Sequence, residues 1–200
     1  MKYLSCTAII LMLAACNTGS EKKAAENTAA TSGTPVTIQT SEATKKAITG
    51  VLGAYYQLKN ALVEADTTAA NKAAVTLATL ADSIRVDGIK DSSLSSTIKN
   101  FSGTIAAEAI ALPEEQDITG KRRSFSMITE NLYPLLQSVQ YNESVIYHDM
   151  CPMAFNDTEA AFWLSDNREV VNPYLGKKHP KYASGMLHCG ELKDSLSYRK

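Results

Sequence analysis

The sequence is poor in the features that mark several common functional classes. Its 20 Lys and Arg residues nearly balance 21 Asp and Glu, and the formal net charge of −1 gives no electrostatic argument for nucleic-acid binding. The chain contains no Gly-x-Ser-x-Gly elbow of a hydrolase and no Cys-x-x-Cys-His motif for covalent haem attachment. We therefore expect a protein that is not an enzyme and that has no nucleic acid among its partners.

Long hydrophobic runs are also missing, and the apolar run at residues 7–13 is too short to span a bilayer. This run follows Lys2 and ends in Leu13-Ala-Ala-Cys16, which resembles the lipobox of bacterial lipoproteins. We expect residues 1–15 to be a signal peptide and Cys16 to carry a lipid anchor, with palmitate among its acyl chains. Such a protein would be held at a bacterial membrane and would face the periplasm or the cell exterior.

Beyond the expected anchor the chain divides into a tether and one domain. Residues 16–40 are rich in Ala, Thr and Ser and contain no aromatic residue, which predicts a flexible tether. Residues 41–200 predict a single, mainly α domain. Apolar residues recur at helical spacing in four segments that begin near Ser41, Asp66, Ser92 and Asp117. The short connections between these segments predict an up-down four-helix bundle.

The helical pattern weakens toward the C-terminus. Pro134 predicts a kink or an early end of the fourth helix near Tyr133. From about residue 143 to residue 195 we expect a small, irregular lobe of short strands and loops, packed on the end of the bundle. Its extended pieces are expected at residues 143–148, 160–164 and 186–189, and Pro152 makes a turn plausible next to Cys151.

Sulfur and imidazole groups, which are rare in this chain, gather in two short clusters of the C-terminal lobe. The members of the two clusters are His148, Met150, Cys151, Met153, Met186, His188 and Cys189. Thiolate, thioether and imidazole are the ligands that the soft ion Cu(I) prefers. The clusters therefore predict a site for a soft metal, provided that the fold brings them together.

The same segment resembles an uncharacterised family of bacterial lipoprotein domains (DUF3347-like). The resemblance rests on the strings Cys151-Pro-Met-Ala-Phe155, Ala161-Phe-Trp-Leu-Ser165, Asn172-Pro-Tyr-Leu-Gly176 and Met186-Leu-His-Cys-Gly190. It covers about residues 48–196 and is strongest after Tyr147. The family also occurs at the C-terminus of some periplasmic adaptor subunits of copper and silver efflux pumps. The resemblance implies Cu(I) handling and heavy-metal efflux components as partners, but this chain lacks the adaptor's hairpin, lipoyl and barrel segments.

The candidate ligands can be ranked by the resemblance. Positions that match the family strings come first, namely Cys151, Cys189, Met153 and Met186. His148, His188 and Met150 come next, and adjacent residues on a strand would point to opposite faces. Three alternatives stay open: Zn²⁺ held by the two cysteines and two histidines, a structural disulfide between Cys151 and Cys189, and a thiol nucleophile at Cys151 with His148 as its base.

Overall fold

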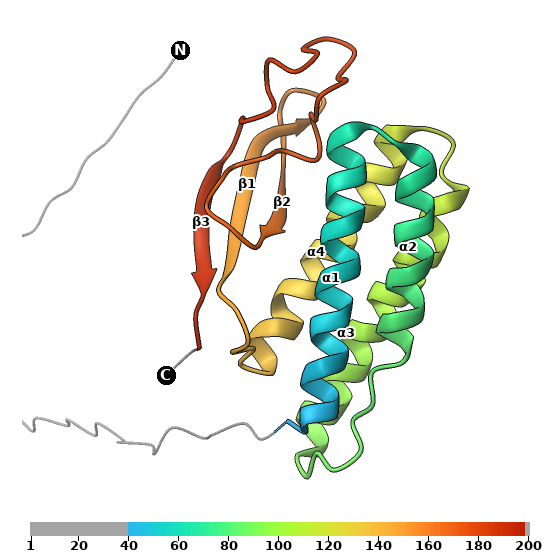
Figure 1. Ribbon diagram of the computed structural model, residues 1–200, viewed down its shortest axis with the longest axis vertical. Helices are drawn as coiled ribbons and strands as arrows, with labels where there is room; N and C mark the ends of the chain where they lie inside the picture. Colours follow the sequence, from blue (N-terminus) through green and yellow to red (C-terminus); the bar gives the residue numbers. More distant parts are fainter. Residues whose placement is uncertain (1–39, 199–200) are drawn as a thin grey trace, which may run out of the picture. The chain divides into compact units, whose positions relative to one another are not determined.

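The computed structural model describes residues 40–198 (Figure 1). The expected signal peptide, the lipidation site Cys16 and almost all of the expected tether lie outside the described residues. No helix of the described part of the chain is long and apolar enough to cross a membrane.

Four α-helices occupy the first part of the domain, as the hydrophobic spacing predicts. They are α1 (Glu42–Glu64), α2 (Thr67–Asp82), α3 (Ser92–Ala111) and α4 (Ile118–Ser138), with a short 3₁₀ helix, η1 (Leu112–Glu114), before α4. Each α-helix begins after a side-chain cap that accepts a backbone N–H of the first turn; the caps are Ser41, Asp66, Asp91 and Asp117. A polar cap of this kind satisfies backbone donors that have no partner within the helix.

Consecutive helices pack against each other, α1 on α2, α2 on α3 and α3 on α4 (Figure 1). Alanines at positions such as Ala70, Ala74 and Ala81 are fully buried on α2 and allow its neighbours a close approach. The backbones of α1 and α4 come close at few positions, and these helices meet through long side chains such as the stacked Tyr55 and Phe125. Four helices in a mainly α fold are thus confirmed, whereas the up-down arrangement of a closed bundle remains a prediction.

Pro134 lies inside α4, and the helix continues to Ser138. The expected early end near Tyr133 is therefore wrong. A proline removes one backbone donor from the helix interior, but the residues after it are held by packing, since Leu135 and Leu136 are fully buried. Ser138 Oγ also donates a hydrogen bond of 2.7 Å to the Pro134 carbonyl.

The C-terminal part forms a three-stranded antiparallel sheet. Its strands are β1 (Ile146–Phe155), β2 (Glu159–Ser165) and β3 (Glu191–Leu196), and their order in the sheet is β2-β1-β3. The expected third extended piece at residues 186–189 is wrong, because residues 186–188 are in a turn and the strand begins at Glu191. Pro152 does not end β1; the strand continues to Phe155 with a register shift in this region.

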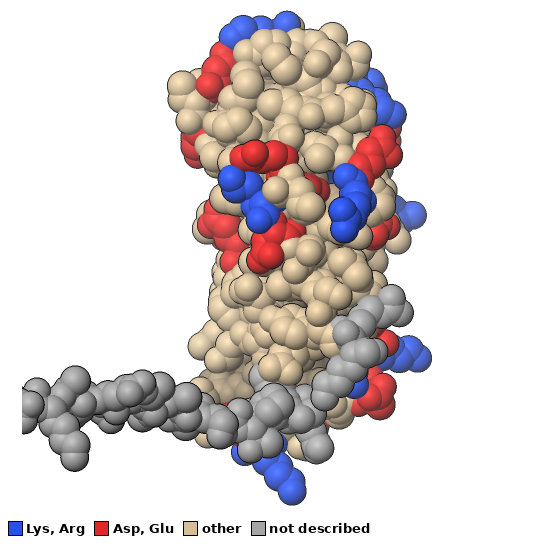
Figure 2. All heavy atoms as spheres, turned by 90° about the vertical axis from the view of Figure 1, so that its left-hand side faces the viewer, with Lys and Arg blue, Asp and Glu red and all other residues tan. Residues whose placement is uncertain are grey.

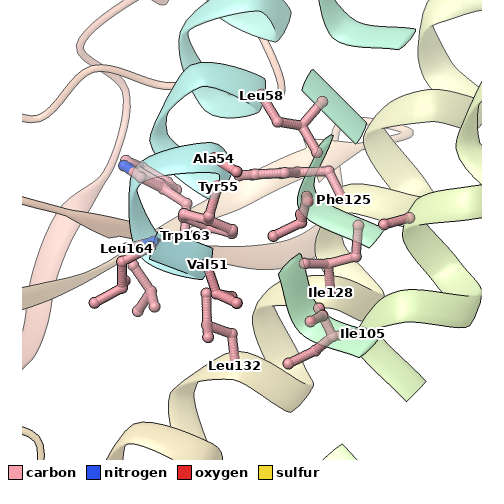
Figure 3. Packing of buried hydrophobic residues seen from close by; sticks show 14 of the residues in the cluster. Val51, Ala54, Tyr55, Leu58, Ile105, Phe125, Ile128, Leu132, Trp163 and Leu164 are labelled. Carbon is pink, nitrogen blue, oxygen red and sulfur yellow. Dashed lines mark hydrogen bonds between the residues drawn. The ribbon is translucent and has the colours of Figure 1, made fainter. Parts of the chain in front are cut away.

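The sheet lies along the side of the helices and not at their end, which corrects the expected placement of the lobe (Figure 1). Trp163 and Leu164 of β2 reach the buried cluster that includes Val51 and Tyr55 of α1 and Leu132 of α4 (Figure 3). Side chains of β2 therefore share the core with those of α1 and α4, whose backbones approach each other at few positions.

The outer edge of β2 is closed by tyrosine hydroxyl groups. Leu164 N–H donates to Tyr55 Oη at 3.0 Å. Thr129 Oγ1 donates to the Phe125 carbonyl at 3.0 Å, so the 2.7 Å contact between Tyr55 and Thr129 has the tyrosine as donor. On the same edge, Tyr174 Oη donates to the Phe162 carbonyl. Backbone groups that would otherwise be buried without partners are thus satisfied from outside the sheet.

Acidic and basic side chains are interspersed on the side of the molecule where β3 lies (Figure 2). β3 itself carries Glu191, Lys193 and Asp194, and Lys193 pairs with Glu191 at 2.9 Å. Charged side chains on an exposed strand discourage further strand pairing.

Candidate metal centre

The fold brings together the two cysteines that the sequence places 38 positions apart. Cys151 lies in β1 and is fully buried, whereas Cys189 follows the turn that leads into β3 and is partly exposed. Their sulfur atoms are 3.5 Å apart, and both are free thiols. Of the two sulfur clusters, these two cysteines are the members that the fold brings into contact.

A buried amide holds the segment that carries Cys189. Asn172 is fully buried, and its Nδ2 donates to the Cys189 carbonyl at 2.7 Å. Its Oδ1 accepts from the backbone N–H groups of Tyr174 and Leu175 at 2.8 and 3.0 Å. Its backbone N–H donates to the Leu187 carbonyl at 2.8 Å. In the sequence, residues 172–176 stand out only as one of the family strings, because nothing in an Asn-Pro pair indicates a partner 17 positions away.

Gly190 lets the chain pass close to β1 immediately after Cys189. Its φ is +148°, and a Cβ added there would lie 2.7 Å from Trp163 Cη2 and 2.9 Å from the Met150 carbonyl oxygen. Both the conformation and the lack of space exclude a larger side chain. The glycine of the Met-x-x-Cys-Gly string is therefore required sterically at position 190.

The Cys189 thiol is in an environment that favours its neutral form. Burial raises the pKa of the Cys189 thiol to about 11, and the neighbouring Cys151 adds to this shift. Cys189 is therefore protonated at neutral pH in the metal-free protein. Binding of a metal by thiolates would release protons, so metal affinity should rise with pH.

Neither histidine of the clusters lies beside the cysteine pair. On β1, which pairs regularly with β2 from Tyr147 to Cys151, His148 and Cys151 point to opposite faces. The His148 ring is stacked between Tyr133 and Phe162, with ring centroids 3.9 and 4.9 Å away. His188 is exposed, and its Nδ1 is 2.8 Å from the Val170 carbonyl. In the described part of the chain, no group of three or more His, Cys, Asp and Glu residues is arranged to hold a metal ion.

The methionines are divided between the two faces of the sheet and the turn. Met150 lies on the same face of β1 as His148, opposite Cys151. Met153 follows Cys151 by two positions, and Met186 precedes Cys189 in the turn, where its carbonyl accepts the Cys189 N–H at 3.0 Å. Met153 and Met186 are both partly buried and pack against the hydrophobic core, as Cys189 does. These two methionines remain the thioether candidates that the family strings favour.

Protonation of His148 should destabilise the protein. Burial lowers the pKa of His148 from its ordinary value of 6.5, and Asp194 opposes this shift only in part. The unfolded chain therefore binds a proton before the folded protein does, and the free energy of unfolding should decrease as the pH falls below about 6.5. Urea unfolding at a series of pH values measures this slope. His148→Phe should reduce it, whereas His188→Gln, at an exposed site, should leave it unchanged; an unchanged slope in His148→Phe would contradict the assignment.

Comparison with known proteins finds a family match over the helical part only. Residues 51–144 match the model of a family described as protein of unknown function (DUF3347). No curated protein and no solved structure matches the chain. The match supports the expected DUF3347-like family from within α1 to the end of α4 and ends before β1, so the C-terminal strings that carried the resemblance lie beyond it. Similarity to efflux adaptors and to lipoproteins remains a prediction.

Proposed function

We propose that the protein is a membrane-anchored extracytoplasmic lipoprotein that binds Cu(I) through Cys151 and Cys189. It would act in copper handling or heavy-metal efflux, with an up-down helical bundle as the scaffold of the site. One observation supports this proposal: the sulfur atoms of Cys151 and Cys189 lie 3.5 Å apart although the two residues are 38 positions apart in the sequence.

Low coordination number is the reason to prefer copper. Cu(I) is stable with two thiolates and accepts thioether as a further ligand, so Cys151 and Cys189 suffice, with Met153 and Met186 in support. Zinc requires four ligands in tetrahedral arrangement, and the geometry of the described residues offers neither His148 nor His188 to the pair. Zn²⁺ is therefore the weaker alternative.

The unequal exposure of the two cysteines suits transfer of the metal. Cys151 is fully buried, whereas Cys189 is partly exposed at the surface. A partner thiolate could replace Cys189 first while Cys151 still holds the ion, so that ligands exchange one at a time. No catalytic step is required, in keeping with a protein that is not an enzyme.

A structural disulfide is the second candidate, since two thiols at 3.5 Å need little movement to form a bond. Closing a loop of 38 residues would stabilise the folded protein by about 4 kcal/mol in the chain-entropy model. Oxidation would consume both proposed copper ligands, so the two functions exclude each other at any one time.

An anaerobic Cu(I) competition titration of the reduced protein tests the proposal. We expect one Cu(I) per chain, bound tightly, with binding lost in the Cys151→Ser/Cys189→Ser double variant. Met153→Ala and Met186→Ala should weaken binding, whereas Met127→Ala, an exposed methionine on α4, is the matched control and should not. Absence of Cu(I) binding by the reduced protein would refute copper handling. A mass lower by two hydrogen atoms after purification without reductant would then establish the disulfide.

A further inference from the structure

A hollow of about 510 Å³ lies apart from the cysteine pair, between the first turn of α4, the β1–β2 hairpin and residues 179–181. Its walls include Thr119, Arg122, Asp157, His179 and Lys181. Neither Cys151 nor Cys189 lines it. The volume falls within the range of pockets that bind small molecules.

Arg122 is the unusual member of this wall, because it is a buried cation without a carboxylate partner. Only 3% of the Arg122 residue is exposed. Its only hydrogen bond among the described residues is from Nη2 to the Leu62 carbonyl at 3.1 Å, and Nε has no partner. A guanidinium has five N–H donors, so most of its donor capacity is unused. Burial lowers the pKa of Arg122 to about 10, which still leaves it charged at neutral pH.

The other charged groups of the hollow do not neutralise Arg122. Lys181 pairs with Asp157, and the Tyr182 hydroxyl donates to the same carboxylate at 2.8 Å. Burial and the nearby Arg122 lower the pKa of His179, and its Nδ1 accepts the Lys181 backbone N–H at 3.2 Å. His179 is therefore neutral at pH 7, with its proton on Nε2. The lining residues thus carry one uncompensated positive charge.

The first turn of α4 adds backbone donors to this wall. Asp117 caps the helix by accepting the Gly120 N–H at 2.8 Å. The N–H groups of Ile118 and Thr119, both in the wall, have no partner among the residues that the structure describes. The Glu115 carboxylate also approaches this turn, next to Gly120, but does not line the hollow. The positive end of a helix dipole therefore faces the same space as Arg122.

We propose that this hollow is a binding site for a small oxyanion, either a carboxylate or a phosphate. The planar guanidinium of Arg122 matches two oxygen atoms of such a group. The first turn of α4 supplies further N–H donors, and Lys181 supplies long-range attraction. Neither cysteine lines this site, so a test of oxyanion binding does not depend on whether the protein binds copper.

The test follows the side-chain Nε–Hε resonance of Arg122 in ¹⁵N-labelled protein during addition of sodium acetate or sodium phosphate. Ionic strength is held constant with sodium chloride. We expect a saturable shift with at least one of the two oxyanions by about 50 mM; which of them binds identifies the oxyanion as a carboxylate or a phosphate. Lys181→Gln should weaken this binding about threefold, because it removes one exposed charge.

Lys177→Gln is the matched control, since Lys177 is an ion-paired lysine of the same segment that does not line the hollow. It should bind the oxyanion as the unmodified protein does. Three results would each overturn the proposal: no shift with either oxyanion, an equal shift with chloride, or equal weakening in Lys177→Gln and Lys181→Gln. Both substituted lysines are exposed, so the variants should fold.

Discussion

Replacing Trp163 with alanine should lower the free energy of unfolding by about 3–5 kcal/mol. Trp163 is fully buried in β2, where it lies close to Tyr55 of α1 (Figure 3). The ring centroid of Tyr174 is 6.1 Å from that of Trp163. Its removal would leave a cavity between the sheet and the helices, and the close contact with Gly190 would be lost. Urea unfolding followed by circular dichroism measures the loss, because this is the only tryptophan for fluorescence.

Trp163→Phe should cost less than Trp163→Ala, since a ring still fills part of the space. The indole Nε1 has no hydrogen-bond partner among the described residues, so no polar contact is lost with it. A loss below about 1 kcal/mol in Trp163→Ala would show that the sheet is not fastened to the helices by this side chain.

Replacing Lys59 with methionine should destabilise the protein by about 3 kcal/mol. Lys59 of α1 is buried, and its Nζ donates to Ser165 Oγ of β2 at 3.5 Å. Asp149 of β1 is also buried, and its Oδ2 has no partner in the described part of the chain. Burial raises the pKa of Asp149, while Ser165 and Lys59 favour its charged form. Without Lys59 the carboxylate would be left uncompensated inside the protein.

The double variant Lys59→Met/Asp149→Asn separates charge from packing. If the buried carboxylate causes the loss, Asp149→Asn should restore most of the stability that Lys59→Met removes. Lys45→Met is the surface control, because Lys45 forms only an exposed pair with Glu42, and it should change the free energy of unfolding by less than about 1 kcal/mol. Equal stability of the single and double variants would contradict the coupling.

The helices could be predicted closely because their signals are local. Ser41 caps α1 and Asp66 caps α2 at the expected positions, and the apolar spacing between caps set each buried face. Of the two outcomes expected at Pro134, the early end was wrong: proline argues locally for a stop, whereas the burial of Leu135 and Leu136 depends on the rest of the fold. Tertiary packing outweighed the local preference of one residue.

The candidate site was predictable in its residues and not in its geometry. Cys151 and Cys189 stand out because cysteine is rare in this chain. A metal site required the fold to bring them together, and the sequence alone could not show whether it does. The placement of His148 depends on Tyr133, which lies on a different element, and its stacking has no signature in the sequence. The burial of Arg122 was not predictable either, because in the sequence it is the middle residue of the basic run at positions 121–123.

The tyrosine bonds on the edge of β2 also bear on how the sheet acquires its pairing. Tyr55 accepts from residue 164 and Tyr174 donates to residue 162, which are groups on the same edge of the strand. A slip of β2 by one residue would turn these groups away from both hydroxyls and send Trp163 to the other face. Tyr55 of α1 and Tyr174 of the turn before Gly176 therefore favour one register of the sheet, and correct pairing of β2 depends on both hydroxyl groups.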